Sequence, residues 1–125
     1  NSLELPDLTK CPALDYIADY AFNGAGYHPT GGITLNIPGT VKHVGFGAFS
    51  FMRRIGSGGM ILAQVNLGSA TSPSQLVSIG LGKNFEANTG RSHGNFTAYG
   101  ITNESLKNDI TTYWLGKFTG TTSWL

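Results

Sequence analysis

Ionisable side chains are scarce in this 125-residue sequence. Asp, Glu, Lys and Arg together make up 12% of the residues, against roughly 25% in an average soluble protein. The formal net charge is +1, and the largest basic cluster is the pair Arg53 and Arg54. A protein that follows a phosphate backbone needs a basic stripe. The sequence therefore predicts no nucleic-acid partner.

Cysteine and long apolar runs are also nearly absent. Cys11 is the only cysteine, which excludes an intrachain disulfide and leaves a buried free thiol or an interchain bridge. No apolar run approaches the ~18 residues that a transmembrane helix needs. Glu4 and Asp7 stand where a signal peptide would carry its basic region. We therefore expect no membrane insertion, and we interpret the chain as a mature protein or an excised domain.

Catalytic and metal-binding signatures are missing as well. The three histidines, His28, His43 and His93, lie far apart, and neither HExxH nor paired-cysteine spacing occurs. Ser57 in "GSGG" lacks the strand-to-helix turn of a hydrolase serine. We therefore expect no catalytic residue, no metal and no cofactor.

One enzymatic alternative is a small polysaccharide hydrolase. Asp15 and Asp19 are four residues apart and would share a face if a helix spans them. Two acids at the right separation can cleave a glycosidic bond, and Glu86 is a further candidate acid. The simpler interpretation of the Asp pair is a solvated helix face.

Glycine, by contrast, is abundant, with 18 of 125 residues. After residue 26, apolar and β-branched runs recur between Gly, Pro, Asn and Ser, at residues 33–37, 41–51, 60–67, 75–85, 94–102 and 109–118. Short strands separated by turns are typical of a mainly β fold, an antiparallel sandwich or a jelly-roll-like domain. No later window has the length and period of a crossover helix, which disfavours a parallel sheet.

The expected organisation is a single domain over residues 1–125. Residues 1–26 form a lead-in with one short helix, and residues 27–125 form the β-sandwich. Pro12 precedes apolar residues at helical spacing, and Asn23 and Gly24 supply a stop, which predicts a helix over about residues 12–22. The alternation of aromatic and other residues from Tyr16 to Phe22 leaves a strand as the alternative. Residues 101–109 are expected to hold one helical turn at most, and no internal repeat is evident.

Two segments place glycines where a strand is expected. Gly45 and Gly47 alternate with larger residues in "VGFGAFSF", and Gly80 and Gly82 do so in "IGLGKN". Glycine within a strand packs nothing and costs backbone entropy. Either another layer or subunit packs closely on this backbone, or the backbone is a flat floor for a ligand. The first interpretation also fits tight association between identical chains.

Polar and aromatic residues together suggest sugar recognition. Sugars present C–H faces that stack on rings and hydroxyls that match amides and imidazoles. The two densest segments are "GRSHGNFTAYG" and "AGYHPTGG". The candidate ligand-binding residues are Tyr27, His28, Arg91, His93, Asn95 and Tyr99. Core packing is the alternative role for the aromatic residues.

Residues 27–125 combine low charge, a high content of Gly, Thr, Asn and Ser, short strands and glycine–aromatic alternation. With this combination the segment resembles the receptor-binding tips of bacteriophage tail fibres and tailspikes. The resemblance is one of overall style, and it implies a β-rich homotrimer on a virion surface that binds a surface glycan or receptor. A lectin-like extracellular adhesin has the same composition. We expect a non-enzymatic module for cell-surface carbohydrate, and the alternative is a structural trimerisation or assembly domain of a fibre or capsid.

Overall fold

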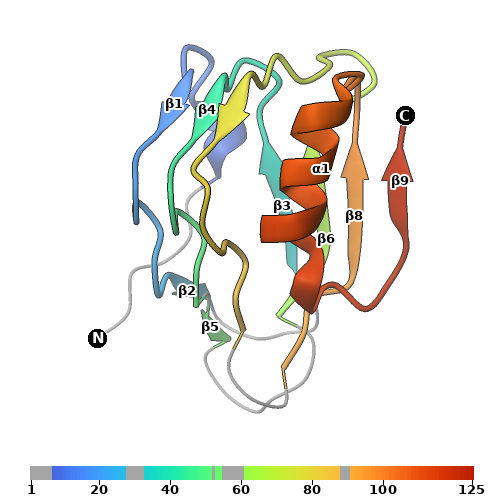
Figure 1. The fold of residues 1–125 in the computed structure, drawn as a ribbon. Coiled ribbons are helices and arrows are strands. Elements are labelled where there is room, and N and C mark those ends of the chain that lie inside the picture. Colours follow the sequence, from blue (N-terminus) through green and yellow to red (C-terminus); the bar gives the residue numbers. More distant parts are fainter. Residues whose placement is uncertain (1–6, 28–32, 52, 55–60, 88–90) are drawn as a thin grey trace.

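The computed structural model describes residues 7–27, 33–51, 53–54, 61–87 and 91–125. It is an α/β fold with two all-parallel sheets, of three and four strands, together with a pair of short parallel strands and one α-helix (Figure 1). Each strand pairing in these ranges is parallel. The expected antiparallel sandwich or jelly-roll-like domain is therefore wrong.

The strands divide into three sheets. The three-stranded sheet has the order β1-β4-β7, and the shortest sheet pairs β2 with β5. The four-stranded sheet has the order β3-β6-β8-β9. Their bounds are β1 (Tyr16–Ile17), β2 (Gly26–Tyr27), β3 (Ile33–Ile37), β4 (His43–Val44), β5 (Arg53–Arg54), β6 (Leu62–Leu67), β7 (Ser78–Ile79), β8 (Asn95–Ala98) and β9 (Thr122–Trp124). The helical elements are η1 (Leu8–Lys10), α1 (Glu104–Tyr113) and η2 (Leu115–Lys117).

The chain visits these sheets in the same order on each round, so it winds as a solenoid. The first coil holds β1, β2 and β3, the second β4, β5 and β6, the third β7 and β8, and the fourth α1 and β9. Paired residues in successive coils are about 26 to 35 positions apart, a period typical of solenoids. In Figure 1, α1 lies next to β7, where a fourth strand of that sheet would stand.

The sequence disfavours a parallel arrangement because parallel strands usually return through helices. Here the return path is the opposite side of the coil, which is itself extended or turn-like. The chain passes the three-stranded sheet, crosses at β2 or β5, and comes back through the four-stranded sheet (Figure 1). A solenoid therefore needs no crossover helix between its parallel strands.

The helix expected over about residues 12–22 is also wrong, because β1 and turns occupy this segment. The backbone N–H groups of Tyr20, Phe22 and Gly24 donate to carbonyl oxygens of the second coil at 2.8–3.0 Å. In a helix these N–H groups would donate to carbonyl oxygens of the same helix. Here they donate to the neighbouring coil, so hydrogen bonds between coils replace helical ones. The first coil is thus part of the solenoid and not a lead-in to a sandwich.

A helix forms instead where residues 109–118 were expected to be a strand. Asn103 caps α1, its side-chain oxygen accepting from the backbone N–H of Leu106 at 3.0 Å. Leu106, Ile110 and Trp114 are buried at spacings of four residues, which places them on one face. The limit of one helical turn over residues 101–109 is therefore wrong too.

The other expected strands exist but are mostly shorter. The prediction for residues 33–37 is confirmed by β3. Within residues 41–51 only β4 is a strand, and within 75–85 only β7. Runs 60–67 and 94–102 contain β6 and β8. The remaining residues bend the chain around the core.

The core lies between the two larger sheets. Leu35, Val65 and Phe96 occupy matching positions of β3, β6 and β8 and are buried. Phe22, Phe49 and Phe85 come from three successive coils and stack with ring centroids 5.4 and 5.2 Å apart. One ring per coil therefore forms a column through the core.

The glycines of the second and third coils allow close approach between coils. A Cβ added to Gly45 would meet the backbone nitrogen of Asp19, and one added to Gly80 would meet the backbone of Phe46. Gly47 has φ +64° and lies against the ring of Tyr20. The layer that packs on these glycines is thus the neighbouring coil. In the ranges described above, no helix is long and apolar enough to span a bilayer.

Candidate functional site

Polar side chains cover the outer side of the four-stranded sheet. Side chains alternate along a strand, so Leu35 and Val65 point inward while their neighbours point outward. The register aligns the outward residues in two rows across the strands. We call this surface the amide face and define it by Thr34, Asn36, Gln64, Asn66, Asn95, Thr97 and Ser123.

Hydrogen bonds connect the central side chains of the amide face. Gln64 Nε2 donates to Thr97 Oγ1 and to Asn66 Oδ1, both at 2.9 Å. Asn66 Nδ2 donates in turn to Asn36 Oδ1 at 2.9 Å. Donors and acceptors of one amide are thus polarised by the next, which strengthens each bond. The described chain supplies no partner for Asn36 Nδ2 or Gln64 Oε1, so these groups face solvent with hydrogen-bonding capacity left.

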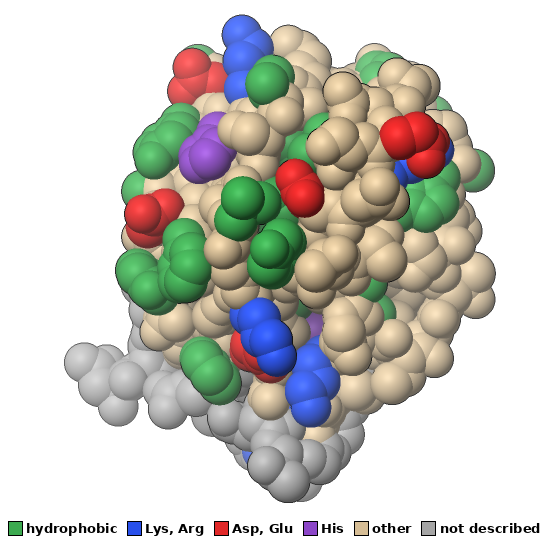
Figure 2. Space-filling model, viewed as in Figure 1, with side chains coloured by type: hydrophobic (Ala, Val, Ile, Leu, Met, Phe, Trp, Pro, Cys, Tyr) green, Lys and Arg blue, Asp and Glu red, His purple; other side chains and the backbone are tan. Residues whose placement is uncertain are grey.

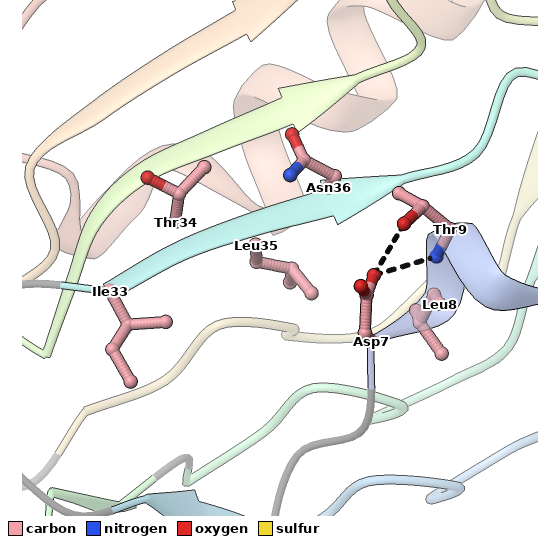
Figure 3. A pocket seen from close by; sticks show the side chains of 7 residues that line it. All are labelled: Asp7, Leu8, Thr9, Ile33, Thr34, Leu35 and Asn36. Atoms are coloured by element: carbon pink, nitrogen blue, oxygen red, sulfur yellow. Dashed lines mark hydrogen bonds between the residues drawn. The ribbon is translucent and has the colours of Figure 1, made fainter.

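Two depressions adjoin the β3 side of the amide face. The first, of about 280 Å³, is lined by residues of η1 and its cap and by residues 33–36. The second, of about 390 Å³, lies beside the turns that follow β3 and β6. Thr9 and Asn36 line both. Figure 3 shows Thr34 and Asn36 on one side of β3, with Asp7 and Thr9 near the end of the strand.

Asp7 contributes a fixed negative charge to the first depression. Its carboxylate accepts hydrogen bonds from the Thr9 hydroxyl and from the Thr9 backbone N–H, the latter at 3.0 Å (Figure 3). These bonds stabilise the charged form and lower the pKa of Asp7. The depression thus combines an amide donor, Asn36, with an ionised acceptor.

The structure distributes the predicted ligand-binding residues over several places. Tyr27 lies in β2, and His28 falls outside the described residues. Arg91 and Tyr99 are half-buried. Asn95 alone lies on the amide face, where its side-chain oxygen accepts from the backbone N–H of Thr121 at 2.8 Å. The predicted residues that the structure describes therefore do not form one cluster.

His93 is a core residue in this structure. Its side chain is fully buried, with Nε2 2.9 Å from the carbonyl oxygen of Phe85 and Nδ1 accepting from the backbone N–H of Leu62 at 3.3 Å. Burial lowers the pKa of His93 to about 4. The neutral ring joins β6 to the third coil and is not presented to a ligand.

The acids proposed for a hydrolase have separate roles. Asp19 Oδ1 accepts from the backbone N–H of Phe46 at 2.9 Å, and Glu86 pairs with Lys83 at 3.5 Å. Asp15 and Asp19 share no helix face, since β1 and turns replace the helix. Within the described ranges, no group of three or more His, Cys, Asp or Glu residues is arranged to hold a metal ion.

Sequence reasoning missed most of the amide face. The signal was present in "TLNI" and "QVNL", where polar residues alternate with buried ones at the same place in two coils. This alternation indicates a shared polar surface only when the strands pair in parallel, because the parallel register places Asn36 beside Asn66 and Gln64 beside Thr34. An antiparallel arrangement would have separated them.

Comparison of the chain with protein-family models, with curated proteins and with solved structures gives no match.

Proposed function

We propose that this chain is a non-enzymatic binding module that recognises neutral cell-surface carbohydrate through the amide face. The observation that supports this most is the row of bonded side chains from Thr97 through Gln64 and Asn66 to Asn36. These bonds hold the face in one arrangement before a ligand arrives, which lowers the entropic cost of binding.

The chemistry of the face matches a polyhydroxylated ligand. Each sugar hydroxyl donates one hydrogen bond and accepts others, and amides offer both kinds of group. Asn36 supplies a donor at the depressions, while Gln64 Oε1 and the Asp7 carboxylate supply acceptors. An acidic sugar would meet the charge of Asp7 there, so the proposed ligand is uncharged.

The scarcity of charge supports the same proposal. A surface solvated mainly by amides and hydroxyls changes little with ionic strength. Such a surface suits work outside a cell or on a virion, as part of an adhesin or fibre. We therefore expect affinity for the glycan to depend only weakly on salt.

A glycan array tests the proposal. The protein is displayed multivalently on streptavidin, and the double variant Asn36→Ala/Asn66→Ala is compared with the unmodified chain. Losing two hydrogen-bonding side chains at about 1 kcal/mol each predicts roughly a 30-fold weaker interaction. Asn108→Ala, an exposed asparagine on α1, is the matched control and should bind normally.

Two results contradict the proposed function. The first is a multivalent protein that binds no glycan on the array while remaining folded by circular dichroism. The second is an equal loss of binding in Asn108→Ala and in the double variant, because the loss would then not belong to the amide face.

A further inference from the structure

A second exposed surface lies on the opposite side of the core, over the three-stranded sheet. Large hydrophobic side chains of three successive coils are 41–72% exposed there. Figure 2 shows hydrophobic side chains gathered on the side where β1, β4 and β7 lie. We call this surface the aromatic face and define it by Tyr16, Tyr20, Phe46, Val77 and Leu81.

The rings of the aromatic face are held in fixed positions. Tyr16 stacks on His43 with centroids 5.1 Å apart and an interplanar angle of 10°. His43 Nδ1 lies 2.7 Å from the hydroxyl of Ser78, which fixes the imidazole. The face thus presents rigid groups, which lose little entropy on association.

A second aromatic pair lies one step further along the coils. Tyr20 meets Phe46 edge-on at 5.6 Å. The Phe46 ring occupies the space that a side chain at Gly82 would need. Because residue 82 is glycine, the exposed ring of Phe46 can lie directly against the backbone of the third coil.

The extent of the aromatic face indicates a protein-sized partner. Taking ~150–250 Å² for each fully exposed large side chain, the exposed fractions of its five residues correspond to roughly 400–700 Å². The largest apolar patch on a typical monomer is about 300–600 Å². A standard interface buries about 800 Å² per partner, and about 65% of that area is non-polar in homodimers, so the face supplies about the apolar area that a dimer needs. A single sugar ring would cover only a small part of this surface.

We propose that the aromatic face is the interface between two copies of this chain. The backbone N–H of Lys42 donates to the carbonyl oxygen of Asp15, which precedes Tyr16, and the Asp19 carboxylate accepts from the backbone N–H of Phe46. Both signs of charge therefore border the face, and a second copy is not repelled by a large net charge. A two-fold contact uses the same patch on both partners and closes as a dimer. The amide face, across the core, stays uncovered, and the inference does not depend on the proposed carbohydrate function.

Sedimentation equilibrium across the micromolar range tests this interface. The background is Cys11→Ser, because Cys11 is exposed and could link copies through a disulfide. We expect a concentration-dependent dimer whose dissociation constant rises roughly 30-fold or more in Leu81→Asp and in Tyr16→Asp, as for residues central to an interface. Leu125→Asp is the matched control, since Leu125 is 67% exposed beyond β9, and its dimer should be unchanged.

Several outcomes would overturn the inference. One is a monomer at every concentration in the Cys11→Ser background. Another is a dimer that survives Leu81→Asp and Tyr16→Asp while both variants keep the native thermal midpoint. A dimer lost in Leu125→Asp would move the interface to another surface, and a trimer would exclude the two-fold contact.

Discussion

Protonation of His93 should limit stability in mild acid. The pKa of His93 is about 4 in the folded chain, against 6.5 for an ordinary histidine, because burial disfavours the imidazolium. Between these values the unfolded chain binds a proton that the folded chain does not. The free energy of unfolding therefore includes the full contribution of neutral His93 above about pH 6.5, and it falls as the pH decreases toward about 4. Each pKa unit corresponds to about 1.4 kcal/mol, so the total loss is about 3 kcal/mol.

Urea unfolding from about pH 7.5 to about pH 4.5 measures this loss. In His93→Gln, the side-chain amide can still donate to the Phe85 carbonyl and accept from the Leu62 N–H, but it does not titrate. We expect most of the pH slope between about 6.5 and 4.5 to disappear in this variant. Asn108→Ala, which removes an exposed, non-titrating side chain of α1, should keep the slope of the unmodified chain.

An unchanged slope in His93→Gln would refute the reasoning. An NMR titration provides a second readout that does not rely on a substitution. The ring resonances of His93 should stay at their neutral positions down to about pH 5. A midpoint near 6.5 for these resonances would show that the buried ring gains its proton without the expected penalty.

Three further substitutions, one of them with a control variant, test the packing of the coils and the cap of α1. Gly45→Ala should lower the free energy of unfolding by about 1–3 kcal/mol, because the added Cβ would meet the backbone of Asp19. Gly116→Ala is the control, since a Cβ there meets open space and should change stability little. Thermal melts distinguish the two variants. Asn103→Ala should cost about 1 kcal/mol by removing the cap of α1, seen as a lower urea midpoint with an unchanged m-value. Phe85→Ala should cost about 3–5 kcal/mol, since its ring is buried in the Phe column, and a loss under 1 kcal/mol in chemical unfolding would contradict that role.

The sequence predicts where extended segments lie better than how they pair. Alternation in residues 33–37 indicates a strand, and β3 is that strand. Parallel and antiparallel partners, however, require the same alternation. Direction is decided by the path of the chain between strands, and turn-rich connections do not reveal that path locally.

A repeat that is too weak to be evident from the sequence alone carries the missing information, so the expectation of no internal repeat is corrected by the structure. Residues 15–22, "DYIADYAF", and residues 42–49, "KHVGFGAF", correspond position by position. Ile17 pairs with Val44, and Phe22 stacks on Phe49. The match is weak because exposed positions differ freely between coils while only inward positions are constrained. The repeat indicates parallel pairing, because equivalent residues of successive coils then lie side by side.

The candidate site was predictable in chemistry and less so in position. The sequence predicts recognition through amide and hydroxyl groups, and its candidate ligand-binding residues include Asn95 of the amide face. Ligand contacts often concentrate in loops, which favoured the loop segments over the strands. Gln64 and Asn66 resemble ordinary outward-facing strand residues until the register places them beside Thr97 and Asn36.

The connection between β6 and β7 shows where this architecture accommodates extra length. It is longer than the connection between β3 and β4, yet the rings of Phe49 and Phe85 on either side of it still stack. The added residues close on themselves, with the Ser69 N–H donating to the Ser72 carbonyl at 2.9 Å. Insertions can therefore accumulate in this outer loop without disturbing the hydrophobic interior, and it offers a natural point for grafting a tag or epitope.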